Sequence, residues 1–237
     1  MWLITRPPGY GDPVAKTYHS ATIDGVPHRP DQQRNTERGA QTRDRILDAA
    51  EQIFSQRGYA ATRIEDISTT VGIRKPSVIH HFTSKLELHN EVMNRIYAAL
   101  LDATHAALDN TTGDETRIFR IADAWLDFIA SRPPAGRLFL RSAVDNSFAT
   151  ARIGPEAREL LDTWTQAVQE VVKQEEFSIT EPLELLSVFA GAALMFVSIH
   201  PWLSGAVEPA SNEQGLLEPY RKMLHRSLHA ILSTDVR

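Results

Sequence analysis

The chain has 237 residues, long enough for one domain or two small ones with a substantial core, and its net charge of -5 excludes a wholesale nucleic-acid coat. It contains no cysteine, which excludes disulfides, thiolate metal sites and cysteine nucleophiles. Residues 1–90 carry 12 Lys and Arg against 10 Asp and Glu, whereas residues 91–237 carry 13 against 20. A mildly basic N-terminal part (the head, residues 1–90) on an acidic remainder (the body, residues 91–237) is typical of a protein that contacts phosphate at one end only.

Neither the first residues nor the longest apolar run of the sequence indicates a membrane protein. The first residues, MWLITRPPGYG, lack the basic and apolar segments of a signal peptide. The longest uninterrupted apolar run, residues 188–197, is too short to cross a bilayer. The sequence therefore predicts a soluble, cytoplasmic protein with no membrane partner.

Residues 1–40 contain five prolines and no helical period, so they are predicted to form a mostly flexible N-terminal arm. Arg29, Arg34 and Arg38 lie just before the first predicted helix. Such an arm is a candidate for entering a DNA minor groove. A solvated tail, or a start assigned too far upstream, is the alternative.

Residues 41–88 carry a compact series of helix signals. The apolar residues between Ile46 and Phe54 recur on one helical face. Gly58 is expected to end this first helix, because glycine takes the left-handed conformation at little steric cost. Thr62 and Glu65 form a Thr-x-x-Glu capping box, which predicts the start of a second helix.

The second and third helices are predicted to meet at a tight turn at Gly72. The third helix is expected from Arg74 to Phe82, with a proline tolerated in its first turn. Ser84 and Glu87 form another capping box, which opens a fourth helix. Two short helices across a glycine turn, supported by longer helices on either side, indicate a helix-turn-helix domain.

The third helix places polar side chains around one core residue, Val78. Such a helix fits a major groove, where Arg and Lys can donate to guanine edges and Ser or His can bond a base or a phosphate. A cation in the first turn of the fourth helix opposes the helix dipole, so an external phosphate would favour it. A solvated polar surface is the alternative for each side chain. The predicted DNA-binding residues are Thr42, Arg43, Thr62, Arg74, Lys75, Ser77, Ile79, His80, His81 and Lys85.

This stretch resembles the DNA-binding domain of the tetracycline-repressor (TetR) family. The family usually has Ser or Thr at the position of Arg74, and at the position of Ile79 it has a Tyr that commonly touches a phosphate. The resemblance implies a dimer whose C-terminal body holds a pocket for a small-molecule effector. It covers about a fifth of the chain and rests on residues 46–54, Gly58, Tyr59, Thr62, Ile67, Val71, Gly72, Ile73, His80, His81, Phe82, Ser84, Lys85 and Leu88.

Residues 89–237 carry further helix signals and no convincing strand. A helix is predicted from Lys85 to about Asn110, followed by helices over residues 115–131, 138–148, 154–176 and 180–202. A Ser-x-x-Gln box at Ser211 opens the last helix. The predicted fold class is all-α, with an N-terminal three-helix helix-turn-helix domain followed by a larger helical ligand-binding and dimerisation domain.

Aromatic and methionine side chains of this body are candidates for lining an apolar cavity that takes a flat or lipid-like ligand. Plain core packing is the alternative for each of them. His225 and His229 have the i, i+4 spacing of metal ligands, but no third ligand lies nearby in the sequence, so a solvent-facing pair is favoured. No cofactor is predicted. The candidate ligand-binding residues are Phe119, Trp125, Phe128, Phe139, Trp164, Met195, Phe196 and His200.

The segment over residues 180–202 has almost no polar face, and a helix that is apolar all round is expected to be buried all round. Because the body is too small to bury it alone, a second chain is the simplest cover. This helix and the last one are predicted to pair with their copies as a four-helix interface about a two-fold axis. The predicted dimerisation residues are Phe189, Ala193, Val197, Leu217, Tyr220, Leu224 and Leu228.

The sequence thus predicts a transcriptional regulator that binds a palindromic double-stranded operator as a homodimer and is released by a small apolar or aromatic effector. Most look-alikes are repressors. The alternative is a helical small-molecule-binding protein or enzyme whose head does not bind DNA. The sequence lacks a Gly-x-Ser-x-Gly elbow, a His-Glu-x-x-His motif and any nucleophile–base constellation, which disfavours the enzyme.

Overall fold

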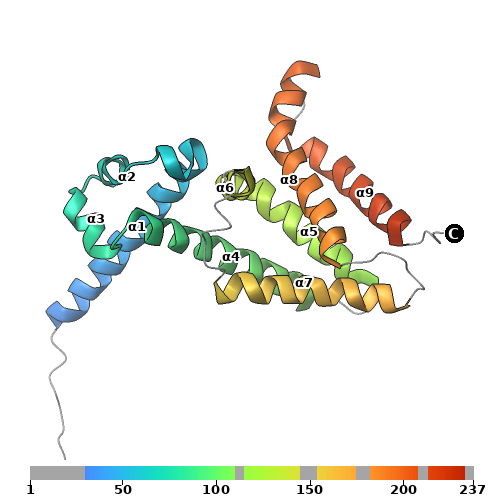
Figure 1. Ribbon diagram of the computed structural model, residues 1–237, viewed down its shortest axis with the longest axis horizontal. Coiled ribbons are helices and arrows are strands. Elements are labelled where there is room, and N and C mark those ends of the chain that lie inside the picture. Colours follow the sequence, from blue (N-terminus) through green and yellow to red (C-terminus); the bar gives the residue numbers. More distant parts are fainter. Residues whose placement is uncertain (1–29, 110–114, 145–153, 175–181, 208–212, 233–237) are drawn as a thin grey trace, which may run out of the picture. The chain divides into compact units, whose positions relative to one another are not determined.

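The structure is a computed structural model that describes residues 30–109, 115–144, 154–174, 182–207 and 213–232. Within these ranges it is helical and contains no strand (Figure 1), which confirms the all-α prediction. Packing separates residues 1–40 from a second unit, residues 41–237. The helices are α1 (Pro30–Ala61), α2 (Ile64–Val71), α3 (Lys75–His81), α4 (Lys85–Asp109), α5 (Glu115–Ser131), α6 (Pro133–Val144), α7 (Pro155–Gln174), α8 (Pro182–Val207) and α9 (Glu213–Leu232).

Helix α1 begins at Pro30, earlier than the sequence pattern indicated. The prediction of an irregular arm is therefore wrong for residues 30–40, because Pro30 occupies the helix start, where proline is tolerated. Arg29 and the rest of the predicted arm lie outside the described residues. Gly58 interrupts α1 with φ 78 and ψ 169, so the expected break is present, although its ψ is extended rather than left-handed helical.

The first four helices share one hydrophobic core. Ile46 and Phe54 from α1, Ile67 from α2, Val78 from α3 and Leu88 from α4 are all fully buried. Between α2 and α3 the chain turns at a left-handed glycine, as the sequence predicted. The turn is closed by the amide of Ile73, which donates to the carbonyl of Ser68 at 2.9 Å. The short helix α3 is therefore fixed through one inward residue, and its other side chains are left to the surface.

The predicted capping box at Thr62 and Glu65 is wrong by one residue. Helix α2 starts at Ile64, and the carboxylate of Asp66 accepts the amide of Arg63 at 3.1 Å. Thr62 is buried, and its hydroxyl donates to the carbonyl of Gly58 at 2.7 Å. The break at Gly58 frees this carbonyl from the helix ladder, which explains why Thr62 turns inward.

The second predicted box is present in part. The amide of Glu87 donates to the Ser84 hydroxyl at 3.0 Å, which satisfies one of the free amides at the start of α4. The carboxylate of Glu87, however, accepts the amide of Thr83 at 2.7 Å. The hydrogen bond from the Thr83 hydroxyl, followed by the one from the Thr83 amide, lowers the pKa of Glu87.

Two helix boundaries in the body bear on function. Helix α5 has the bounds that the sequence predicted, whereas α6 starts at Pro133 and not at Leu138. The Pro133-Pro134 pair was interpreted as a break, but proline suits the first turn of a helix. Gly136 of α6 then lies close to α8, since a Cβ built on it would be 3.6 Å from Cδ1 of Leu194.

Helix α8 is not buried all round within one chain, in agreement with the expectation that the body is too small to bury it alone. Leu183, Val188 and Met195 on one flank are 56%, 58% and 48% exposed, while Leu185 and Ala193 on the other flank are buried. By length and composition alone, Pro182–Ile199 could cross a membrane, with 18 residues, a mean hydropathy of 1.9 and 17% of the segment buried. A single such helix is weak evidence, because core helices of soluble proteins pass the same test.

The predicted dimerisation residues divide into two groups. Ala193, Tyr220, Leu224 and Leu228 are buried inside their own chain, so their assignment to a surface between two chains is wrong. The stripe on α9 packs inward, with Tyr220 stacked on Phe196 of α8 at a centroid distance of 3.7 Å. The remaining three, Phe189, Val197 and Leu217, are half-buried.

Candidate nucleic-acid interface

Helix α3 is the element that could read DNA. Arg74 caps its N-terminus in an extended conformation, and Pro76 occupies its first turn. Val78 points into the core and sets the rotation of the helix. On the outward side, the exposed residues are Arg74, Lys75, Pro76, Ile79 and His80, while Ser77 and His81 are half-buried.

Lys75 forms an ion pair within the helix-turn-helix. Its ammonium lies 2.7 Å from a carboxylate oxygen of Glu65 on α2. This bond is the main reason that the pKa of Glu65 is lowered. Both side chains are about half exposed, so solvent screens the pair and Lys75 can exchange Glu65 for a DNA acceptor.

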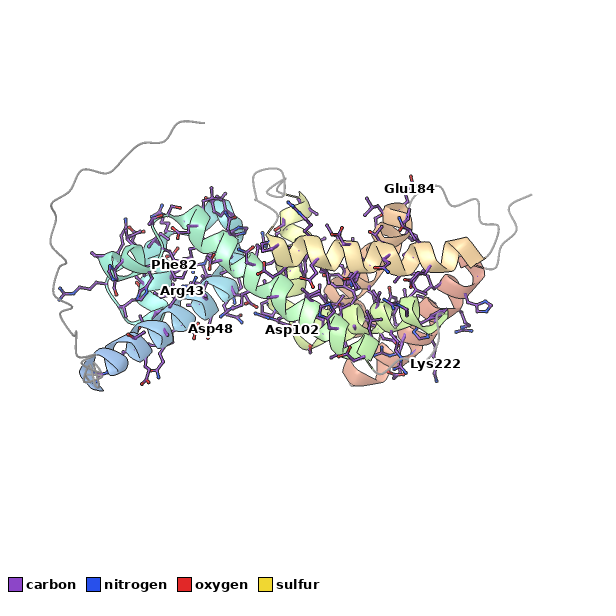
Figure 2. The ribbon with its side chains drawn as sticks, turned by 90° about the horizontal axis from the view of Figure 1, so that it is seen from below. Arg43, Asp48, Phe82, Asp102, Glu184 and Lys222 are labelled. Carbon is purple, nitrogen blue, oxygen red and sulfur yellow. The ribbon has the colours of Figure 1, made fainter. Side chains whose placement is uncertain are left out.

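Arg43 has structural partners as well. Its guanidinium pairs with the carboxylate of Glu91 on α4 and lies 5.0 Å from the ring centre of Phe82 (Figure 2). It therefore ties α1 to α4 and to the residue that ends α3. Thr42 beside it is half-buried. The predicted DNA contacts of Thr42 and Arg43 stay predictions.

Lys85 is engaged by its own chain, which the sequence did not indicate. Its ammonium donates to the carbonyls of Tyr59 at 2.8 Å and Thr62 at 3.0 Å, and it lies 4.4 Å from the Tyr59 ring centre. These carbonyls lie between the break at Gly58 and the start of α2 at Ile64. Lys85 thus holds the start of α4 against the end of α1, and this contact offsets the unfavourable helix dipole that a DNA phosphate was expected to offset.

We expect Lys85→Ala to lower the free energy of unfolding by about 2 kcal/mol, because charge-assisted hydrogen bonds to two carbonyls are lost. Urea unfolding followed by circular dichroism measures the change. Lys75→Ala is the matched control, since it removes only a surface ion pair, and a much smaller loss of stability is expected. Unchanged stability of Lys85→Ala, with a shallower salt dependence of DNA binding, would restore the phosphate role.

Thr62 drops out of the predicted DNA-binding set. It is buried and its hydroxyl is used inside the chain. The remaining candidates, Arg74, Ser77, Ile79, His80 and His81, lie on or beside α3 at its accessible side. Burial, followed by the charges of His80 and Arg43, lowers the pKa of His81, which is therefore expected to be neutral at pH 7.

His89 is a buried titratable group that the sequence did not single out. It lies on α4 with its ring 5.1 Å from that of Phe54 and 5.2 Å from that of Tyr59. Burial, followed by the charge of Lys85, lowers its pKa. The folded domain therefore favours neutral His89.

This lowered pKa makes stability depend on pH. Because the folded pKa of His89 lies below its unfolded value, the contribution is complete above about pH 6.5 and is lost as the pH falls below it. We expect the urea concentration at the midpoint of unfolding to fall when the buffer is changed from pH 7.5 to pH 5.5. In His89→Phe this fall should be smaller; an equal fall in both proteins would assign the effect to other groups.

The body contains a small apolar cavity of about 30 Å³ between α5, α7, α8 and α9. Trp125 and Trp164, two of the candidate ligand-binding residues, belong to its lining, and their ring centres lie 5.8 Å apart. The indole N–H of Trp125 donates to the Ala190 carbonyl at 3.1 Å, and that of Trp164 to the Thr104 hydroxyl at 3.3 Å. The lining residues are Ile118, Ile121, Ala122, Trp125, Trp164, Leu185, Leu186, Phe189, Ala190 and Leu228.

The other predicted ligand-binding residues do not share this cavity. Phe128 lines an open cleft of about 730 Å³, and Phe119 lines another of about 490 Å³. Phe139 packs on Trp125 at 5.4 Å, and Met195 is exposed. The predicted ligand-binding residues therefore do not line a single cavity, because aromatic composition does not indicate which side of a helix a ring occupies. Phe196 stacks on Tyr220, and the His200 side chain lies outside the described residues.

The four-helix head with its outward-facing α3, followed by a helical body, defines a helix-turn-helix protein. Residues 46–92 match the sequence profile of the family described as "Bacterial regulatory proteins, tetR family". These residues therefore match the DNA-binding segment of the TetR family, as the sequence motifs predicted.

Individual relatives extend the similarity beyond the head. The chain is 29% identical over 134 residues to the transcriptional activator FasR of Mycolicibacterium smegmatis, covering 56% of this chain and 59% of that protein. It is 35% identical over 81 residues to the transcriptional repressor KstR2 of the same organism, covering 31% and 40%. The chain thus spans about half the length of these curated relatives. Both are regulators, in agreement with the prediction that the chain is not an enzyme.

A solved structure supports the fold along more of the chain. The transcriptional regulator SCO4942 from Streptomyces coelicolor superposes with a TM-score of 0.59 at 21% identity. The match covers 80% of this chain and 97% of that one. The similarity at this identity concerns the fold.

Proposed function

We propose that the chain is a transcriptional repressor that binds a two-fold-symmetric operator through α3. The observation that carries the proposal is a short helix held by one buried residue, Val78, with its other side chains turned outward, inside a TetR-family head. The two named relatives include an activator and a repressor. Repression is therefore proposed in addition to DNA binding. Expression of a reporter gene placed behind the operator distinguishes repression from activation.

We further propose a homodimer formed by the exposed flank of α8. Leu183, Val188 and Met195 lie on this flank, and Gly191 between them has room around its Cα for a close helix approach. Met223 of α9 is an exposed apolar neighbour on the adjoining helix. Soluble monomers rarely leave a large contiguous apolar patch uncovered, so a second copy is its natural cover.

The proposed effector is neutral and largely hydrocarbon. The cavity around Trp125 and Trp164 is lined by apolar side chains, and both indole N–H groups already have acceptors inside the chain. A charged ligand would lose its hydration there without gaining a partner. Its volume of about 30 Å³ is far below the roughly 300 Å³ of a ligand pocket, so entry must displace α8 from α5.

Contacts from α6 would carry this displacement to the head. Gly136 of α6 lies against Leu194 of α8. Arg141, farther along α6, donates to the carbonyls of Ser55 at 3.1 Å and Gln56 at 2.8 Å, just before the break in α1. A shift of α6 would therefore change the position of α1, and with it that of α3. The coupling requires only about 1–3 kcal/mol.

Selection of bound molecules from a random duplex library tests the DNA-binding proposal. We expect enrichment of a palindrome whose half-sites lie about 34–36 Å apart, one helical turn. Recovery of unrelated sequences without symmetry would favour the alternative, a helical small-molecule-binding protein or enzyme with an inactive head.

Fluorescence tests the effector proposal in a variant in which Trp2 and Trp202 are replaced by Phe, leaving Trp125 and Trp164 as the probes. Naphthalene is expected to change their emission and to lower operator affinity by about 5- to 150-fold. The matched anion, 2-naphthoate, is expected to do neither. Tighter binding of the anion would overturn a neutral effector.

A further inference from the structure

We propose that Ile79, together with Pro76, reads thymine methyl groups in the major groove and so supplies part of the operator's sequence. The inference rests on the proposed DNA binding by α3. It assigns to Ile79 a role that a phosphate-binding side chain at this position would not have.

The accessible surface of α3 is less cationic than its sequence indicates. Val78 is fully buried, so Pro76 and His80, which lie two residues on either side of it, are the residues farthest from the core. Ile79, three residues after Pro76, shares its side of the helix and is 38% exposed. The outermost part of α3 thus presents two adjacent apolar side chains.

Several cationic side chains on and around α3 have competing partners. Lys75 is paired with Glu65, and Ser77 is half-buried. Arg43 is paired with Glu91, and Lys85 is bonded to the carbonyls of Tyr59 and Thr62. The side chains of Ile79 and Pro76, in contrast, can meet a groove without breaking a hydrogen bond or an ion pair.

The chemistry of these two side chains limits what they can recognise. Neither has a hydrogen-bond donor or acceptor, so they cannot bond a phosphate or a base edge. In the major groove, the only apolar group on a base edge is the 5-methyl of thymine. Burying one such methyl favours binding by about fourfold, which becomes about 16-fold when both half-sites of a two-fold operator are counted.

Replacing thymine by deoxyuridine removes only this methyl group, so it isolates the contact. Each thymine of the selected operator is replaced in turn, symmetrically in both half-sites, and the affinity is measured by fluorescence anisotropy at fixed salt. For the unmodified protein we expect a loss of about 16-fold at one or two thymines per half-site and none at the others. In Ile79→Ala the affinity for the thymine operator falls, and the penalty at one of these positions disappears.

The matched control is Leu161→Ala, which shortens an equally exposed apolar side chain on α7, in the body. It should keep the full deoxyuridine penalty. Circular dichroism confirms that Ile79→Ala is folded, as expected for a change at the surface.

Two results would overturn the inference. One is that uracil is tolerated at every position, and the other is that its penalties persist unchanged in both Ile79→Ala and Pro76→Ala. In either case the proposed function stands if the unmodified protein still prefers the selected operator to a scrambled duplex. Failure to prefer any duplex would instead reject the proposed function and this inference together.

Discussion

Gly191→Glu is expected to reduce operator affinity by more than about a hundredfold while leaving each protomer folded. Gly191 lies on the exposed flank of α8, and a Cβ built there meets nothing within 4 Å. The substitution should therefore fit a single chain, and glutamate is a better helix former than glycine. At an interface between two copies it would bury an unpaired charge, which costs about 3–5 kcal/mol and would separate the dimer.

Sedimentation velocity and operator anisotropy, performed on the same samples, measure both parts of this prediction. Gly39→Glu is the matched control, because its Cβ also meets nothing within 4 Å and it lies on α1. It should leave self-association unchanged. Ala193→Glu and Leu224→Glu are unsuitable, because both residues are buried in their own chain and a charge there would disrupt the protomer. A Gly191→Glu protein that remains a dimer would move the interface away from this flank.

Glu51→Ala is expected to lower the free energy of unfolding by about 3 kcal/mol. The Glu51 carboxylate is buried on α1 and accepts hydrogen bonds from Arg132 at 2.8 and 2.5 Å and from Arg95 at 3.0 Å. Its loss would leave two guanidinium groups without their shared counter-charge. The Arg side chains are about a quarter exposed, so solvent reduces the penalty below that of a fully buried pair.

Asp48→Ala is the control for Glu51→Ala. Asp48, labelled in Figure 2, lies 2.7 Å from the same Arg95, but its side chain is 70% exposed. Its replacement should cost about 1 kcal/mol or less. Urea unfolding measures the free energy of unfolding of the two variants. Equal losses in both would mean that burial of Glu51 does not add to the stability that its ion pairs contribute. Because Arg132 joins α5 to α6, the Glu51→Ala protein should also respond less to effector.

Local signals in the sequence were sufficient for much of the fold. The bounds of α5 and α3 followed from helical period and flanking residues, and Gly72 marked the turn between α2 and α3. Two of the missed boundaries have one cause in common. Pro30 and Pro133 were interpreted as signs of irregular chain, although each stands at the start of a helix.

The roles of individual polar residues were less predictable, because their partners are distant in the sequence. Lys85 bonds the carbonyl of Tyr59, 26 residues away, and Arg43 pairs with Glu91, 48 residues away. Only the folded chain brings these groups together. The outward face of α3, by contrast, follows from the spacing of its residues around Val78.

The proposed dimer surface illustrates a second limit of sequence patterns. Periodicity identified the apolar stripe of Tyr220, Leu224 and Leu228, but it could not distinguish packing within one chain from packing between two. The structure uses this stripe inside the protomer and leaves Leu183, Val188 and Met195 exposed. The surface available to a second copy is therefore the opposite flank of α8.

The most direct test of the central claim, sequence-specific DNA binding by α3, compares the affinity for the selected operator with that for a scrambled duplex of equal length at one salt concentration. We predict a preference of at least about 1,000-fold, the lower end for specific DNA-binding proteins. Arg74→Ala/His80→Ala, a double variant of two exposed positions at α3, should lose most of this preference. Equal affinity of the unmodified protein for both duplexes would contradict the claim.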